Sequence, residues 1–313
     1  TAHPMTDPAP SQLRPAAGPP KSPPSQRRSS KRTVSDAWIA LAFLAPALVA
    51  LVAFRLLPAG YSIVESFRVG DAWVGLANYR FMFATDAVVD SLVTTFVFSL
   101  WINPLQVAIA LALALLLYER PFMAGTWRML VFMPAAVPLS VSTIVWGVGF
   151  RPDDGIVNAL LAVLGVPPQP WLTSPDQALI AIMILASWAG VGYWMLFLVA
   201  GLQDVPRSYL EAARLDGAGF WRSFLHIQLP LLKRPLAFVL VAATVANFLL
   251  FPPIQILTRG GPQGSTNLLI YEIFRNAYTF ADYGLAYAQM VLLIGVMIAV
   301  VAVQFRLLRS PTA

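Results

Sequence analysis

The sequence contains no cysteine and only two histidines, His3 and His226. The absence of cysteine excludes disulfides and thiolate chemistry, and two isolated histidines leave little for metal ligation, so no metal site is predicted. Charged residues are also scarce: they make up 12% of the 313 residues, whereas 58% are hydrophobic. This balance is too apolar for a soluble domain of this length. The composition therefore predicts an all-α membrane protein.

The sequence also lacks a nucleotide-binding motif and any pairing of a nucleophile with a base. The run Gly260-Gly261-Pro262 is not followed by the Gly-Lys-Ser/Thr of a phosphate-binding loop, and no strand is predicted before it. We therefore expect that the chain is not an enzyme on its own and that it binds no cofactor. The net charge of +6 does not indicate a nucleic-acid partner, because most basic residues lie in segments that are predicted to be on one side of a membrane.

Six apolar runs are predicted to cross the membrane: Ala37–Leu57, Ser91–Tyr118, Arg128–Phe150, Ala178–Leu202, Pro235–Leu257 and Tyr283–Phe305. If the N-terminus is cytoplasmic, 15 Lys and Arg residues lie on the cytoplasmic side and 6 lie outside. Cytoplasmic segments of membrane proteins carry such an excess of basic residues. Both termini and the loop at residues 203–234 are therefore predicted to be cytoplasmic.

Residues 1–34 differ in composition from the rest of the chain. They are rich in proline, serine, alanine and basic residues and show no apolar periodicity. Such a segment cannot bury enough apolar surface to fold, so we expect a disordered basic cytoplasmic tail. Residues 35–310 are then expected to form one six-helix transmembrane domain.

The most polar run between two long apolar segments is Ser208–Pro230. Ser208 and Glu211 have the spacing of a capping box, which predicts a short helix over Arg207–Asp216. Gly217 stands where a helix end favours a left-handed residue. A second amphipathic helix is predicted to follow and to end at Pro230. The expected structure is two short helices that meet at a glycine turn.

This run resembles the EAA loop of permease subunits in binding-protein-dependent ABC importers, in the carbohydrate-uptake branch that includes maltose-type and glycerol-phosphate-type systems. The residues that carry the resemblance are Glu211-Ala212-Ala213, Asp216-Gly217-Ala218, Phe224, Ile227, Leu229 and Pro230. Two shorter stretches, Gly75–Tyr79 and Arg259–Pro262, are similar to segments of the same branch. The resemblance extends from about Gly75 to the C-terminus and does not include the tail.

The resemblance implies that the loop forms a coupling helix docked on an ATPase subunit. The residues it assigns to this contact are Glu211, Ala212, Ala213, Asp216, Gly217, Ala218, Phe220 and Phe224. It further implies a second homologous permease, two ATPase subunits that bind ATP and Mg, and an external solute-binding protein, all at a bacterial-type cytoplasmic membrane. The implied solute is a sugar or sugar-like polyol, or alternatively glycerol 3-phosphate or a glycerophosphodiester.

Amide and aromatic residues inside the expected spans are candidates for a solute pathway. They are Asn103, Trp188, Tyr193, Trp194, Asn247 and Phe251. Such side chains suit a polyhydroxylated solute, but they also pack helices against one another. Asn103-Pro104 and Pro252-Pro253 are expected to interrupt their helices, because proline removes a backbone hydrogen bond.

Three segments are expected outside the membrane. Pro58–Asp90 holds the Gly75–Tyr79 stretch, Arg151–Gln177 is predicted to form turns with a short helix, and Thr258–Asp282 an external amphipathic helix over Leu268–Phe280. No acid or base lies well inside an expected span, which disfavours an ion-coupled secondary carrier. A membrane enzyme is also disfavoured, since no polar catalytic cluster is visible.

Overall fold

The computed structural model describes residues 34–119 and 123–308, and the chain divides into two compact units, residues 1–55 and 56–313. The expected disordered tail falls almost entirely outside the described residues and stays a prediction. The described part of the first unit is α1 (Val34–Leu51) and the start of a π-helical segment, Val52–Leu56. Large apolar side chains of this unit are exposed, such as Phe43 at 83%. These side chains therefore need an apolar environment that this unit does not itself supply.

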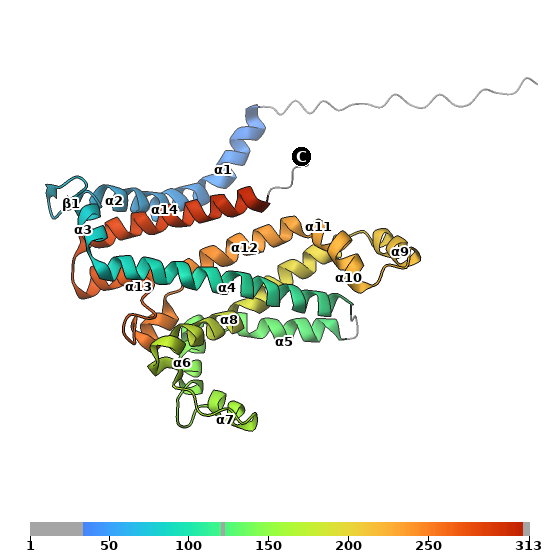
Figure 1. The fold of residues 1–313 in the computed structure, drawn as a ribbon. Helices are drawn as coiled ribbons and strands as arrows, with labels where there is room; N and C mark the ends of the chain where they lie inside the picture. Colours follow the sequence, from blue (N-terminus) through green and yellow to red (C-terminus); the bar gives the residue numbers. More distant parts are fainter. Residues whose placement is uncertain (1–33, 120–122, 309–313) are drawn as a thin grey trace, which may run out of the picture. The chain divides into compact units, whose positions relative to one another are not determined.

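The second unit is helical apart from a two-stranded antiparallel ribbon (Figure 1). Its first elements are α2 (Leu57–Glu65), β1 (Arg68–Val69), β2 (Ala72–Trp73), α3 (Ala77–Ala84), α4 (Asp86–Glu119), α5 (Ala124–Ala136), α6 (Leu139–Gly149), α7 (Ile156–Val163), η2 (Trp171–Thr173) and α8 (Pro175–Gln203). Then follow α9 (Arg207–Leu215), α10 (Phe220–Ser223), η3 (Phe224–Gln228), α11 (Leu229–Leu231), α12 (Lys233–Phe248), η4 (Ile254–Thr258), α13 (Leu269–Phe274), η5 (Arg275–Thr279) and α14 (Tyr283–Leu308).

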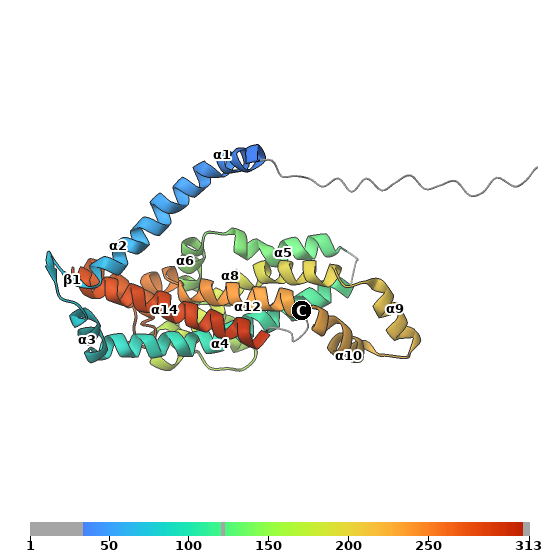
Figure 2. The same cartoon turned by 90° about the horizontal axis from the view of Figure 1, so that it is seen from above.

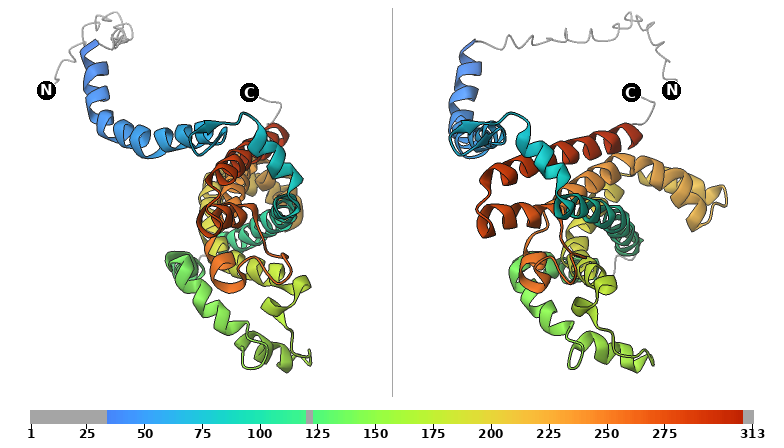
Figure 3. Two further views of the ribbon diagram at one scale, coloured as in Figure 1. Left: turned by 90° about the vertical axis from the view of Figure 1, so that its left-hand side faces the viewer. Right: turned by 60° about the vertical axis from the view of Figure 1, so that its left-hand side comes forward.

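The long helices α4, α8, α12 and α14 run side by side and form the body of this unit. Helices α9 and α10 lie at one end of this body, and β1 and α3 lie at the other (Figure 2). Seen along the long helices, α5 to α7 lie on the opposite side of the body from α14 (Figure 3). The long helices therefore separate the polar α9–α10 segment at one end from β1 and α3, which belong to a segment predicted to be external, at the other end.

Four segments are long and apolar enough to cross a membrane: Leu41–Glu65, Asp86–Tyr118, Pro175–Gln203 and Tyr283–Leu308. The last three coincide with expected spans, and the first is shifted toward the C-terminus relative to Ala37–Leu57. Two bent helix pairs would raise the number to six if each pair crosses as one span. The membrane-helix fold class is thereby confirmed, whereas the exact number of spans stays a prediction.

The expected spans Arg128–Phe150 and Pro235–Leu257 are not single straight helices. The first divides into α5 and α6, which meet at 93°. The break follows from Pro138, which occupies the N-cap of α6 and disfavours helical geometry at the residue before it. The second ends at Phe248, and α12 is instead bent by 69° from the helical run Phe220–Leu231.

The prolines at Pro104 and Pro252 behave differently from each other. Helix α4 continues through Pro104, so the expected interruption there was wrong. Pro104 and Leu100, whose carbonyl loses its helical donor at the proline, both lie on the exposed side of α4. At Pro252 the expectation was correct, because α12 ends at Phe248 and residues 249–251 are not helical.

Close packing of α5 on α8 depends on Gly192. A Cβ atom at this position would overlap the backbone of Val131 and Phe132 in α5. Glycine therefore allows the two helix backbones to approach more closely than any other residue would.

The segment Arg151–Gln177 contains the expected short helix, α7, and is held together by one amide side chain. Asn158 Nδ2 donates to the carbonyls of Pro152 and Gln169, both at 2.9 Å. Its Oδ1 accepts from Gln169 N at 3.1 Å and from Trp171 Nε1 at 2.7 Å. Every polar position of this side chain is used, so the segment is a folded element rather than a loose loop.

Candidate functional site

Helices α9, α10, η3 and α11 form a hairpin of two arms, Arg207–Leu215 and Phe220–Leu231, which we call the coupling hairpin. Gly217 has φ +75°. Its N–H donates to the Arg214 carbonyl at 3.0 Å, and the Ala218 N–H donates to the Ala213 carbonyl at 2.8 Å. These two bonds make a Schellman motif, which satisfies carbonyls at the helix end. The expected glycine turn is therefore present.

Two other local expectations for the hairpin were wrong. Ser208 does not cap α9: the N-cap is Pro206, and no side chain caps this helix. Pro206 fixes the start of the helix at Arg207, so Ser208 falls inside the first turn. Pro230 does not end the second arm either, because it lies inside the helical run Phe220–Leu231, directly after the π-helical turn Phe224–Gln228.

The eight residues predicted to contact an ATPase subunit divide into a supporting pair and a displayed group. Ala213 and Phe224 are each 7% exposed, and the Phe224 ring packs against Phe220 and Trp221 of its own arm. The other six are exposed or half-buried: Glu211, Ala212, Asp216, Gly217, Ala218 and Phe220. The hairpin thus brings all eight residues into one element. Whether they contact a partner stays a prediction.

One face of the hairpin carries a row of alternating charges. Arg207, Glu211 and Arg214 line a cavity of about 610 Å³ together with Tyr118 at the end of α4. Within residues 34–119 and 123–308, none of these three charged residues makes an ion pair with a described side chain. Their charges are therefore available to a binding partner.

The opposite face of the hairpin is mainly apolar. A second hollow of about 440 Å³ lies there, lined in part by Ala212, Ile227 and Leu231. At the tip, Leu215 is 90% exposed and Trp221 is 69% exposed. An apolar tip beside a charged row has the composition of a protein-docking surface, since exposed apolar patches rimmed by polar groups mark interaction sites.

The amides predicted to line a solute pathway lie in the interior. Asn247 Nδ2 on α12 donates to Asn103 Oδ1 at 2.7 Å and to Gln106 Oε1 at 3.0 Å, both on α4. Asn103 Nδ2 in turn donates to Ser99 Oγ at 2.7 Å. Asn247 is 5% exposed and Asn103 is 3% exposed. In this conformation the pair joins α12 to α4.

The aromatic candidates do not gather in one place. Trp188 is 42% exposed and meets Trp146 of α6 edge to face, with ring centroids 5.7 Å apart. Tyr193 packs against Trp194 at 5.0 Å, and Phe251 packs against Phe274 at 4.9 Å.

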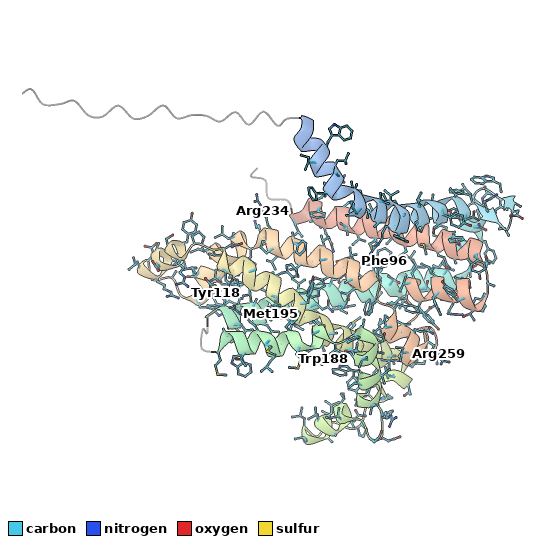
Figure 4. The ribbon with its side chains drawn as sticks, turned by 180° about the vertical axis from the view of Figure 1, so that it is seen from behind. Phe96, Tyr118, Trp188, Met195, Arg234 and Arg259 are labelled. Carbon is cyan, nitrogen blue, oxygen red and sulfur yellow. The ribbon has the colours of Figure 1, made fainter. Side chains whose placement is uncertain are left out.

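Trp188 lies beside a hollow of about 340 Å³ between α4, α5 and α8, which also includes Ser187, Pro134 and Gly192. In Figure 4 it lies along the bundle between Met195 and Arg259. Of the aromatic candidates, Trp188 is the one placed beside a hollow at bundle depth, and no cationic side chain lines that hollow. Across the described part of the chain, no group of three His, Cys, Asp or Glu side chains is arranged to hold a metal ion.

The sequence reasoning missed a buried polar cluster around Glu272. The run Leu268–Phe280 was expected to be an external amphipathic helix, and α13 with η5 does form there. However, Glu272 is 3% exposed, Asn276 is 5% exposed and Gln289 is fully buried. The signal that could have revealed the cluster is the pair Glu272 and Arg275, which have i,i+3 spacing within an apolar run.

Comparison with known proteins gives consistent matches. The family described as "Binding-protein-dependent transport system inner membrane component" matches residues 85–310. The sn-glycerol-3-phosphate transport system permease protein UgpA of Pectobacterium atrosepticum is 33% identical over 287 residues, covering 89% of this chain and 96% of that protein. UgpA of Agrobacterium fabrum is 34% identical over 270 residues, covering 84% of this chain and 92% of that protein.

A solved structure shares the fold. The crystal structure of a bacterial ABC transporter involved in the import of the acidic polysaccharide alginate contains a chain with a TM-score of 0.80. The two sequences are 20% identical, and the match covers 90% of this chain and 98% of the other.

Proposed function

Because this chain belongs to the family of binding-protein-dependent transport system inner membrane components, we propose that it is the permease subunit of an ATP-driven importer that docks an ATPase through the coupling hairpin. The observation that carries this proposal is the hairpin itself. It combines a glycine turn, a row of unpaired charges and exposed apolar side chains at its tip.

The proposed topology has six spans with both termini in the cytoplasm. The four long apolar helices each cross once, and each bent pair crosses as one broken span. The excess of basic residues on one side of this arrangement supports the orientation. It also places the coupling hairpin on the cytoplasmic side, where an ATPase subunit would meet it.

In the proposed mechanism the chain supplies no ATP chemistry of its own. Two separate ATPase subunits bind ATP and Mg, and their closure moves the coupling hairpin together with the hairpin of a second permease. The long helices then open toward an external solute-binding protein and later release the solute inside. The tight packing of α5 on α8 at Gly192 would transmit such a movement, because closely packed helices move together.

For the solute we propose a sugar or sugar-like polyol, with glycerol 3-phosphate as the specific alternative. The UgpA relatives favour the phosphate ester. The hollow beside Trp188 favours a neutral solute, since it is lined by apolar side chains, a serine and a tryptophan. A phosphate would need cationic groups, which the binding protein or the second permease would then have to supply.

The test is ATP-dependent uptake by the complete importer in proteoliposomes. Uptake of radiolabelled sn-glycerol 3-phosphate is compared with uptake of radiolabelled maltose. In both assays the loaded binding protein is outside the proteoliposomes and ATP is inside. Uptake that requires enclosed ATP and is unchanged by collapse of the proton and sodium gradients supports the proposal. Uptake that follows an ion gradient without ATP would establish a secondary carrier instead.

A further inference from the structure

Glu272 is a buried acid that the coupling hairpin and the proposed solute path do not use. It lies on α13, which packs against α4 and α14, and its side chain is 3% exposed. A carboxylate in such surroundings loses its hydration and is retained only where hydrogen-bond donors replace the lost water. A buried acid that is held by several hydrogen-bond donors is therefore expected to have a specific role.

Both oxygens of Glu272 are occupied. Oε2 accepts from Asn267 Nδ2 at 2.9 Å and from Arg275 Nη1 at 3.1 Å. Oε1 accepts from Asn276 Nδ2 at 3.2 Å. Asn276 Nδ2 also lies 3.1 Å from Gln289 Oε1, on α14. Asn276 Nδ2 also donates to the backbone carbonyl of Glu272 at 3.0 Å. The carboxylate thus joins the loop before α13 to α13 and η5, and Asn276 extends this network to the last long helix.

The loop that Glu272 holds, Thr258–Asn267, is stabilised by hydrogen bonds between its own residues. Thr258 Oγ1 and Thr266 Oγ1 are 2.7 Å apart, and Thr266 Oγ1 donates to the Gly261 carbonyl at 2.8 Å. The residues at its tip, Gln263 and Gly264, are exposed. Asn267 is the last residue of this loop before the α13 N-cap, so the bond from Asn267 to Glu272 fixes the base from which the tip projects.

We propose that Glu272 is a positioning residue that locks the Thr258–Asn267 loop and α13 onto α14, so that the exposed loop tip and the last helix move as one piece during transport. The carboxylate acts as a common acceptor for one donor from the loop, Asn267, and two donors from η5, Arg275 and Asn276. Its role is to fix geometry, and neither its charge nor any contact with solute is needed.

The same i,i+3 spacing occurs at an exposed pair, which supplies a matched control. Arg151 and Asp154 are 3.4 Å apart, but their side chains are 57% and 69% exposed. Exposed pairs contribute little to structure because water and salt screen them. Asp154→Asn is therefore expected to change nothing in the loop, whereas removal of the Glu272 carboxylate is expected to release it.

The experiment measures the distance between two spin labels in the reconstituted importer. Cysteines are placed at Gln263 on the loop tip and at Tyr283 at the start of α14, which is 55% exposed. The chain has no other cysteine. We expect a single narrow distance distribution in the parent and in Asp154→Asn, and its loss in Glu272→Ala. Uptake is expected to be lost in Glu272→Ala while the ATPase subunits still co-purify.

Two further variants separate positioning from other roles. Glu272→Gln keeps a carboxamide acceptor facing Asn267 and Arg275, so we expect it to retain the narrow distribution and most of the uptake. Asn267→Leu removes the hydrogen bond from the loop to Glu272 and keeps the carboxylate. It is expected to lose the narrow distance distribution, and this result can be obtained even if Glu272→Ala does not fold. A narrow distribution in Asn267→Leu would overturn the proposal. Equal loss in Glu272→Gln and Glu272→Ala would also overturn it, because the charge itself would then be required.

Discussion

Replacement of Gly217 by alanine tests the turn of the coupling hairpin. The residue has φ +75°, and a Cβ atom built there would meet nothing within 4 Å. The cost of a side chain is therefore backbone strain alone, since there is no clash to relieve. Left-handed geometry costs an ordinary residue about 1–2 kcal/mol.

Strain of this size should act on the hairpin and leave the fold of the bundle intact. Gly217 is exposed and contributes no side-chain packing to the long helices. A cost of one to two kcal/mol corresponds to a factor of about 5–30 in an equilibrium constant. If the native turn is needed for docking, Gly217→Ala should weaken ATPase-subunit binding by up to that factor, and Gly217→Val should do so at least as strongly. Gly217→Asn should be milder, because asparagine tolerates left-handed geometry.

Gly219 provides the control within the same turn. A Cβ atom there also meets nothing within 4 Å, but its φ is −72°, which alanine adopts without strain. The assay is co-purification of the ATPase subunit with the permease, followed by hydrolysis stimulated by loaded binding protein. If Gly217→Ala binds and stimulates as Gly219→Ala does, the left-handed turn has no part in docking.

Three other outcomes are expected. Asn247→Leu should lower the free energy of unfolding in detergent by about 1–3 kcal/mol, because two buried amide oxygens on α4 lose their donor. Unchanged stability together with reduced uptake would instead place Asn247 in the solute path. Gly192→Ala should destabilise the protein by about 1–3 kcal/mol through overpacking against α5, whereas Gly295→Ala, with open space around it, should be neutral or slightly stabilising. A membrane-impermeant thiol reagent added outside should label a cysteine at Asp154 and not one at Ser223, and the reverse pattern would contradict the proposed orientation.

The parts of the structure that the sequence predicted are those set by local rules. The glycine turn at Gly217 depends on the residues immediately before it, and the Schellman bonds lie within the six residues from Ala213 to Ala218. The long apolar runs predicted α4, α8 and α14 because length and composition suffice to identify such helices. The cap at Ser208 failed because two local rules competed, and Pro206 determined where the helix begins.

The parts that could not be predicted depend on contacts between distant segments. Asn103 and Asn247 are 144 positions apart, and no local pattern indicated that each satisfies the other. The continuity of α4 through Pro104 was likewise not indicated by the local rule for proline, which predicts a kink or a break. Burial of Glu272 follows from the packing of α13 between α4 and α14, which the amphipathic pattern of its own run did not reveal.

The exposed tip of the coupling hairpin would affect how long an unassembled subunit persists in the cell. Leu215 and Trp221 are displayed on a short hairpin with no cover from the described part of this chain. Under the proposed docking, a permease made in excess of the ATPase subunit would present these side chains to chaperones and proteases, which recognise exposed apolar surface. Its abundance would then follow the supply of the partner, so that unassembled copies are removed and subunit stoichiometry is maintained by degradation.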